Sequence, residues 1–176
     1  MLFMQFLSRI RGNGTNIKKA IKNGLVVGKN FNCAPSVFID PMHCFLICIG
    51  DDCTFTAKVH ILAHDASTKK HLGFTKIGKV IVGNRVFLGV GVIVLPGVTI
   101  GDDAIVGAGS VVTKSIPPKE VWGGVPAQKI CTLEEYLSKH VGKPSFGNEY
   151  VLSKRLSDQK KQEMRKAVEH GIAYIV

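Results

Sequence analysis

The sequence lacks the features that would mark a membrane or secreted protein. No run of eighteen apolar residues occurs in its 176 residues, so we expect no membrane-spanning helix. The apolar start, Met1–Leu7, lacks a positive n-region and a small-residue cleavage site, so we expect no signal peptide. The five cysteines form an odd set, which argues against a disulfide framework. Together these absences predict a protein of the reducing cytoplasm.

Acidic residues are missing from the first 24 positions, which hold five Lys or Arg. The whole chain has a formal net charge of +10. A solvated basic segment is the plainest interpretation, and a weak contact with anionic lipid headgroups is the alternative. The charge is not interleaved with aromatic residues as in single-stranded nucleic-acid binders, so we expect no nucleic-acid partner.

The sequence does contain a period of six residues. From Val82 to Pro117 it reads VGNRVF LGVGVI VLPGVT IGDDAI VGAGSV VTKSIP. This period fits neither an amphipathic helix nor a simple strand, and it predicts a parallel β-helix in which three units make one turn. The first and fifth positions of each unit should point inward. The first positions are Val82, Leu88, Val94, Ile100, Val106 and Val112, and the fifth are Val86, Val92, Val98, Ala104, Ser110 and Ile116.

The repeat begins near Val27 and is interrupted twice. Its phase breaks at Pro41-Met42-His43 and again after His64. The second break contains a polar segment, residues 65–76, which we expect to leave the prism as a protruding loop. The expected organisation is an N-terminal cap segment (1–24), a β-helix domain (25–131) and a C-terminal helical extension (132–176).

Helix signals flank the repeat. Thr15 could N-cap a short helix that runs through Lys22, and the apolar segment before it is expected to cover the open end of the coil. Thr132 and Glu135 form a capping-box pattern, and Ser157 is placed to N-cap a second C-terminal helix.

His64 is the main candidate for chemistry. It follows the strand Ile61-Leu62-Ala63 and lies at the start of the expected loop. Imidazole, with an ordinary pKa of about 6.5, suits general-base catalysis at neutral pH. A solvated surface histidine is the alternative that composition alone favours.

Three motifs add a family resemblance. They are GAGSVVTK at residues 107–114, IPP at 116–118 and GVPA at 124–127. With the hexads, they resemble the left-handed β-helix (hexapeptide-repeat) acyltransferases over about residues 25–131, and within them the maltose, galactoside and polysaccharide O-acetyltransferases. The resemblance implies a left-handed coil, a homotrimer with active sites between subunits, acetyl-CoA as acyl donor, and a role in polysaccharide biosynthesis.

The resemblance also implies residue roles. His64 matches the histidine that removes the proton from an acceptor hydroxyl, which then attacks acetyl-CoA directly. A backbone N–H from the coil of Gly89 is the expected oxyanion donor. Asp65 is the first candidate for orienting His64, and Asp40 is the second.

The acyl donor is expected along the regular coils. By position the contacts would be Gly89, Ala108, Thr113 and Lys114. Several relatives have Arg where this chain has Gln128, and Lys129 could replace that contact.

The acceptor is expected to be a sugar or glycan precursor near His64, with His43, His60 and His71 as further candidate contacts. Serine, amino-sugar and antibiotic acetylation stay open as alternatives. A non-catalytic β-helix scaffold would need neither His64 nor acetyl-CoA. Metal chemistry like that of the gamma-class carbonic anhydrases has a different histidine spacing, so no metal is expected.

Overall fold

The computed structural model describes residues 15–150 and 156–175. The chain divides into two compact units, Met1–Tyr136 and Leu137–Val176. Among the described residues no helix is both long and apolar enough to cross a bilayer. The apolar segment 1–11, predicted to cap the coil, lies outside the described residues.

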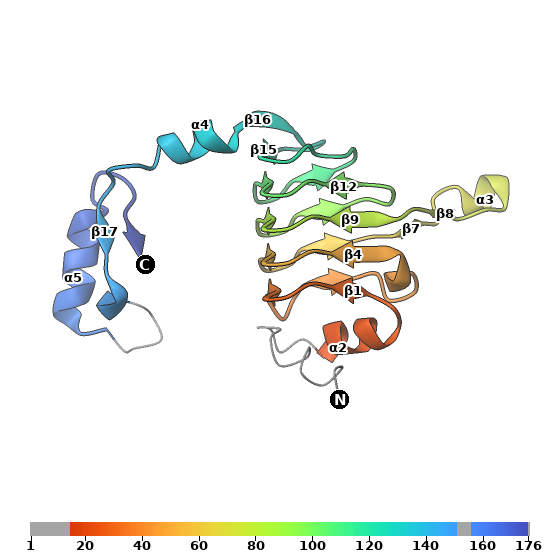
Figure 1. Cartoon of the computed structure of the whole chain (residues 1–176), viewed down its shortest axis with the longest axis horizontal. Helices are drawn as coiled ribbons and strands as arrows, with labels where there is room; N and C mark the ends of the chain where they lie inside the picture. Colours follow the sequence, from red (N-terminus) through yellow and green to blue (C-terminus); the bar gives the residue numbers. More distant parts are fainter. Residues whose placement is uncertain (1–14, 151–155, 176) are drawn as a thin grey trace. The chain divides into compact units, whose positions relative to one another are not determined.

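The first unit is mainly β, with strands of the coil that visit three sheets in turn and pair in parallel within each (Figure 1). One sheet has the order β1-β4-β9-β12, another β14-β11-β6-β3, and the third β16-β15-β13-β10-β5-β2. Each circuit of the chain therefore adds one strand to every sheet. The strands of the coil are β1 (Val26–Val27), β2 (Asn32–Cys33), β3 (Phe38–Ile39), β4 (Ile47–Ile49), β5 (Thr54–Phe55), β6 (His60–Ile61), β9 (Val80–Val82), β10 (Phe87–Leu88), β11 (Ile93–Val94), β12 (Thr99–Ile100), β13 (Ile105–Val106) and β14 (Val111–Val112).

The inward columns predicted from the hexads are confirmed. All twelve first- and fifth-position residues between Val82 and Ile116 are at most 2% exposed. Ser110 is the polar member of this set, and its hydroxyl is satisfied. It donates to the carbonyl of Gly107 at 2.6 Å and accepts from the Gly124 N–H at 3.1 Å. The structure thus gives Ser110 a packing and hydrogen-bonding role inside the coil.

Acidic and amide side chains link successive coils through hydrogen bonds at one corner. The Lys29 N–H donates to Asp51, the Asp51 N–H donates to Asn84, and the Asn84 N–H donates to Asp102, at 2.7–2.9 Å. Each short side chain therefore satisfies a backbone donor on the coil before it, where the turning backbone offers no strand partner.

Helix α2 (Thr15–Lys22) covers the first coil. Its residues Ile17 and Ala20 are buried in the core, and the helix contacts β3 and η1 (Cys44–Leu46). The Cys44 thiol donates to the carbonyls of Ala20 and Asn23, both at 3.5 Å. The first interruption of the repeat therefore supplies η1, which holds the last turn of α2.

The second interruption forms an arm that projects from the coil (Figure 1). Strand β7 (His64–Asp65) pairs antiparallel with β8 (Lys76–Ile77), and the short helix α3 (Lys69–Leu72) lies between them. The arm carries exposed apolar side chains, of which Phe74 is 75% exposed. His64 therefore lies at the base of the arm, where the chain leaves the coil.

The repeat ends in an antiparallel pair, β15 (Glu120–Gly123) and β16 (Gln128–Thr132), followed by α4 (Leu133–Ser138). The predicted capping box is confirmed, because Thr132 and Glu135 exchange two side chain–backbone hydrogen bonds. In the second unit, β17 (Ser145–Phe146) pairs with β18 (Tyr174–Ile175), with η2 (Asn148–Tyr150) and α5 (Asp158–Ala167) between them in sequence. Ser157 N-caps α5, as predicted.

We expect Leu88→Ala to destabilise the coil by about 2–5 kcal/mol, because the fully buried leucine would leave a cavity between coils. Val26→Ala, at a position 56% exposed, should cost less than about 1 kcal/mol. Thermal unfolding followed by circular dichroism compares the two variants. Equal losses would contradict the assignment of inward and outward columns.

Candidate active site

The register of the coils brings His64 and Asp40 together. Ile39 of β3 pairs with Ile61 of β6, so Asp40 lies one coil below the segment that leads to His64. The Asp40 N–H donates to the Ile61 carbonyl at 2.9 Å. The chain bends at Ala63, which is fully buried, and this bend directs the His64 imidazole back over Asp40.

Asp40 is a fully buried carboxylate with a complete set of donors. Its Oδ1 accepts from the N–H groups of Met42 and His43 at 3.0 and 3.1 Å. Its Oδ2 accepts from the Ala63 N–H at 3.0 Å and contacts Nδ1 of His64. Burial alone would raise the pKa of Asp40, but the bonds from His64 and the three backbone donors outweigh it and hold the pKa below its ordinary value. Asp40 is therefore an anion held in place by the fold.

This contact fixes the roles of the two imidazole nitrogens of His64. An ionised carboxylate can only accept a hydrogen bond, so Nδ1 is the donor and Nε2 carries the lone pair. The side chain of His64 remains 29% exposed. A carboxylate–imidazole pair of this kind can take up a proton at Nε2 and stabilise the resulting positive charge.

Asp65, the first candidate for orienting His64, has another partner. Its carboxylate forms an ion pair with Lys76 at 2.6 Å and accepts from the Ser67 N–H at 2.8 Å. The bond from Lys76, followed by those from Ser67, lowers the pKa of Asp65 to about 2. The structure thus places Asp65 in the arm hairpin and puts Asp40, the second candidate, on His64.

Of the other three candidate histidines, one lies against the Asp40–His64 pair and two have other surroundings. The ring of His43 packs against that of His64 in a tilted arrangement, with ring centroids 4.8 Å apart. His60 packs on Phe38, with centroids 5.4 Å apart, and its Nδ1 lies 2.9 Å from the Lys58 carbonyl. His71 is exposed on α3. Only His43 therefore joins His64 and Asp40 in one cluster, which could also offer ligands to a metal ion.

The N–H of Gly89, on the coil expected to supply the oxyanion donor, is already hydrogen-bonded within the coil. Gly89 is buried, and a Cβ there would lie 2.6 Å from the Ala108 nitrogen, so the close approach of two coils requires glycine. The N–H of Gly89 already donates to the Val106 carbonyl at 2.8 Å. A donor from this coil must therefore come from a residue other than Gly89 itself.

The remaining residues expected to contact the acyl donor lie on the last coils, and all are exposed. They are Ala108, Thr113, Lys114 and Lys129. The ammonium of Lys114 donates to Gln128 Oε1 at 3.0 Å and lies 5.2 Å from the centroid of the Trp122 ring. Lys129 forms an ion pair with Glu120 at 2.6 Å. The positive charge of Lys129 is thus already compensated, whereas Lys114 has a neutral amide as hydrogen-bond partner.

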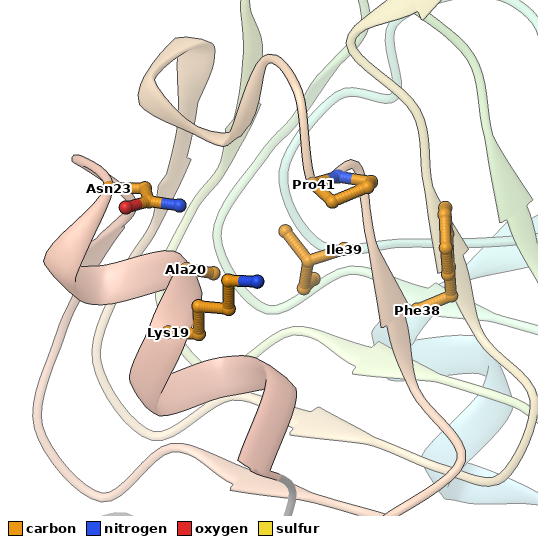
Figure 2. A pocket seen from close by; sticks show the side chains of 6 residues that line it. All are labelled: Lys19, Ala20, Asn23, Phe38, Ile39 and Pro41. Carbon is orange, nitrogen blue, oxygen red and sulfur yellow. The ribbon is translucent and has the colours of Figure 1, made fainter.

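A cavity of about 340 Å³ lies beside the first interruption of the repeat (Figure 2). Helix α2 forms one wall and the end of β3 the other, so Lys19 and Phe38 face the same space. Asp40 lies between two of the lining residues in the sequence. The residues that line the cavity are Lys19, Ala20, Asn23, Phe38, Ile39 and Pro41.

Sequence reasoning did not find the Glu120–Trp122 contact. The Trp122 indole N–H donates to Glu120 Oε2 at 2.7 Å, so one carboxylate holds both Trp122 and Lys129. Two residues apart on β15, Glu120 and Trp122 share a face of the strand, and this spacing was the available signal.

We expect the fluorescence of Trp122, the single tryptophan, to report the protonation of Glu120. Bonds from Lys129 and then Trp122 lower the pKa of Glu120 from its ordinary 4.5. A depressed carboxyl pKa stabilises the fold above the unfolded-state pKa, and that contribution is lost as the pH falls through the folded-state pKa. The emission should therefore change with a midpoint below pH 4.5, and Glu120→Gln should abolish this transition. A midpoint at or above that value would contradict the contact.

Comparisons with known proteins agree with this architecture. Residues 79–114 match the family model for the bacterial transferase hexapeptide (six repeats). The CapG protein of Staphylococcus aureus is 43% identical over 99 residues, which cover 54% of this chain and 58% of CapG. A maltose O-acetyltransferase from Clostridium difficile is 32% identical with a TM-score of 0.53, over 70% of this chain and 63% of that one.

A third similar protein is a hexapeptide-repeat acetyltransferase of Vibrio cholerae in complex with acetyl-CoA. It is 25% identical with a TM-score of 0.56, over 62% of this chain and 61% of that one. The chain spans 61% of the length of the Bacillus subtilis protein YvoF and 58% of that of CapG, which is less than two thirds of either. Residues 79–114 are bacterial transferase hexapeptide repeats, and the chain that carries them resembles the hexapeptide-repeat acyltransferases.

Proposed function

We propose that this protein is an acetyl-CoA-dependent O-acetyltransferase with His64 as its general base. The contact between Nδ1 of His64 and the buried carboxylate of Asp40 is the observation that carries the proposal. It leaves Nε2 as an acceptor on a partly exposed imidazole at the base of the arm. The similar proteins named as acetyltransferases supply the reaction class.

The proposed reaction is a direct transfer with both substrates bound. His64 Nε2 removes the proton from an acceptor hydroxyl, and the hydroxyl oxygen attacks the thioester carbonyl of acetyl-CoA. The tetrahedral intermediate collapses when the carbon–sulfur bond breaks, and the imidazolium returns the proton to the departing thiolate. The products are the acetyl ester and free coenzyme A.

Asp40 acts in this proposal through His64. Its anionic carboxylate holds the imidazole in one orientation and one tautomer, and it stabilises the imidazolium that forms during attack. Three backbone donors prevent the carboxylate from rotating away. The role expected for Asp65 thus passes to Asp40, and Asp65 stabilises the arm through Lys76.

The acyl donor is proposed to lie along the coils that follow the arm. There Gly89 lets its coil pack closely on the backbone of Ala108, and Ala108 is the exposed residue of this pair. Thr113 and Lys114 would contact the phosphate end, with Lys129 as the weaker cationic contact because of Glu120. We further propose a left-handed coil and a homotrimer in which a neighbouring subunit completes this groove.

The acceptor is proposed to be a hydroxyl of a sugar or glycan precursor, which would place the protein in polysaccharide biosynthesis. The similarity to a maltose O-acetyltransferase supports a sugar. The cavity lined by Phe38 and Lys19 offers an aromatic ring and a cation to such a ligand (Figure 2). Amino-sugar, antibiotic and serine acetylation use the same donor chemistry. An activity assay with a panel of acceptors distinguishes them from sugar acetylation. A scaffold protein would bind no acetyl-CoA.

We expect His64→Ala to lower kcat by about 100- to 10,000-fold, because the acceptor hydroxyl loses its base. Asp40→Asn should lower kcat by at least about tenfold, since the amide cannot stabilise the imidazolium. The assay measures coenzyme A release from acetyl-CoA with a panel of sugars, amino sugars, aminoglycosides and serine.

Two matched variants control this experiment. Asp65→Asn removes a neighbouring carboxylate that contacts Lys76 and should leave kcat within about threefold. His60→Ala removes an imidazole that packs on Phe38 and lies outside the Asp40–His64 pair, so kcat should stay close to that of wild type. If His64→Ala retains full activity, or if Asp65→Asn is as damaging as Asp40→Asn, the proposed mechanism is wrong.

Lys114→Ala should raise KM for acetyl-CoA by about five- to fiftyfold with little change in kcat, because a phosphate contact is lost. Lys129→Ala should raise KM less, since Glu120 already compensates that charge. Steady-state kinetics at low and high salt test both, and the difference between wild type and Lys114→Ala should shrink as salt screens the contact. A larger rise in KM for Lys129→Ala than for Lys114→Ala would mean that Lys129, and not Lys114, makes the stronger phosphate contact.

A further inference from the structure

The cluster beside the proposed base has the composition of a metal site. Asp40, His43 and His64 each offer a ligand atom, and these atoms lie within 4.8 Å of one another. Asp40 follows β3 and His43 precedes η1 only three residues later, so the fold contributes by bringing His64, at the start of β7, to this local pair. Asp40 is fully buried, and the histidine side chains are 25% and 29% exposed.

His43 provides the second observation. Its Nδ1 atom is buried and, among the residues that the structure describes, has no hydrogen-bond partner. It faces Oδ1 of Asp40 at 3.9 Å, which is too long for a hydrogen bond. Two ligands of a tetrahedral zinc ion lie about 3.3 Å apart, so a small rotation of the His43 side chain would bring its Nδ1 and the Asp40 carboxylate onto one ion.

We propose that Asp40, His43 and His64 bind a divalent transition-metal ion, with Zn²⁺ as the preferred ion, and that this ion blocks the proposed base. Two imidazoles and one carboxylate form the donor set that zinc takes in three-ligand sites, whereas magnesium and calcium prefer oxygen ligands. The partial exposure of the two histidines leaves a fourth position open to solvent.

The ion competes with the hydrogen bond of the proposed catalytic pair. Oδ1 of Asp40 already accepts two backbone donors, and Oδ2 accepts the Ala63 N–H and contacts His64. The ion therefore takes the place of the proton between Oδ2 and His64 Nδ1. His64 then loses the orientation and tautomer that base catalysis needs. The binding site itself does not depend on the proposed function, but the inhibition does.

Cobalt binding tests the site without any assay of activity. Titration of the metal-free full-length protein with Co²⁺ should give one ion per chain, with visible absorption bands of low-symmetry nitrogen and oxygen ligation. His43→Ala should weaken this binding at least about tenfold, because one ligand is lost. His60→Ala is the matched control, since it removes an imidazole outside the cluster, and its affinity should equal that of wild type.

Two further measurements check which residues bind the cobalt ion and whether the His43 variant folds. Thiolate-to-cobalt charge-transfer bands would assign the ion to the partly exposed Cys48 or Cys131 and would overturn the proposal. Thermal unfolding of His43→Ala checks that the variant folds, and His43→Gln serves as the second variant if it does not. Equal Co²⁺ affinity in wild type and the folded His43 variant would also overturn it.

Acetyl transfer with and without Zn²⁺ separates this proposal from the proposed function. Inhibition by Zn²⁺ that a chelator reverses, and that is weaker in the His43 variant relative to that variant's own metal-free rate, supports both. Cluster-specific Co²⁺ binding in a protein with no transferase activity supports the metal site and overturns the proposed function. Activity that Zn²⁺ leaves unchanged in a protein that binds the ion overturns the proposed block.

Discussion

The stacking of parallel coils is the constraint on which the rest of this structure depends. The strands of the coil from β1 to β14 are only two or three residues long, so none is stable by itself, and each relies on backbone bonds to neighbouring coils. Stacking requires that the inward positions from Val27 to Ile116 be apolar or, as at Ser110, hydrogen-bonded within the coil. The corner ladder from Lys29 through Asp51 and Asn84 to Asp102 satisfies the backbone where the chain turns.

This constraint also explains how a charged group can occupy the core. Asp40 occupies the corner where the coil is interrupted, and burial there would be costly for an isolated carboxylate. Three backbone N–H groups and His64 offset that cost, so the pKa of Asp40 is lowered despite its burial. A carboxylate held by backbone donors cannot reorient when a substrate arrives. The interruption therefore provides a fixed anion beside a partly exposed imidazole, which the regular coils do not contain.

The same arrangement links the two proposals. His64 is shared between base catalysis and the proposed metal site, and both uses depend on the Asp40 carboxylate. A proton between His64 Nδ1 and Asp40 Oδ2 leaves Nε2 ready to accept another proton. An ion in that place removes the orientation of the His64 imidazole that base catalysis needs. The buried and unpartnered Nδ1 of His43 distinguishes the cluster from a simple carboxylate–histidine pair, within the part of the chain that the structure describes.

The sequence by itself determined the inward columns, the two interruptions and the capping residues Thr132 and Ser157, because these depend on local periodicity and local hydrogen bonds. It indicated His64 as a candidate but favoured Asp65 over Asp40 as its partner. Only the tertiary structure decided that contact, since Ile39 pairs with Ile61 across 22 residues, four more than a regular turn of eighteen. A period of six predicts which side chains point inward, but an inserted segment changes which residues lie above one another. The partners of Lys114 and Lys129 were likewise set by the antiparallel return of β16 along β15, which the repeat does not encode.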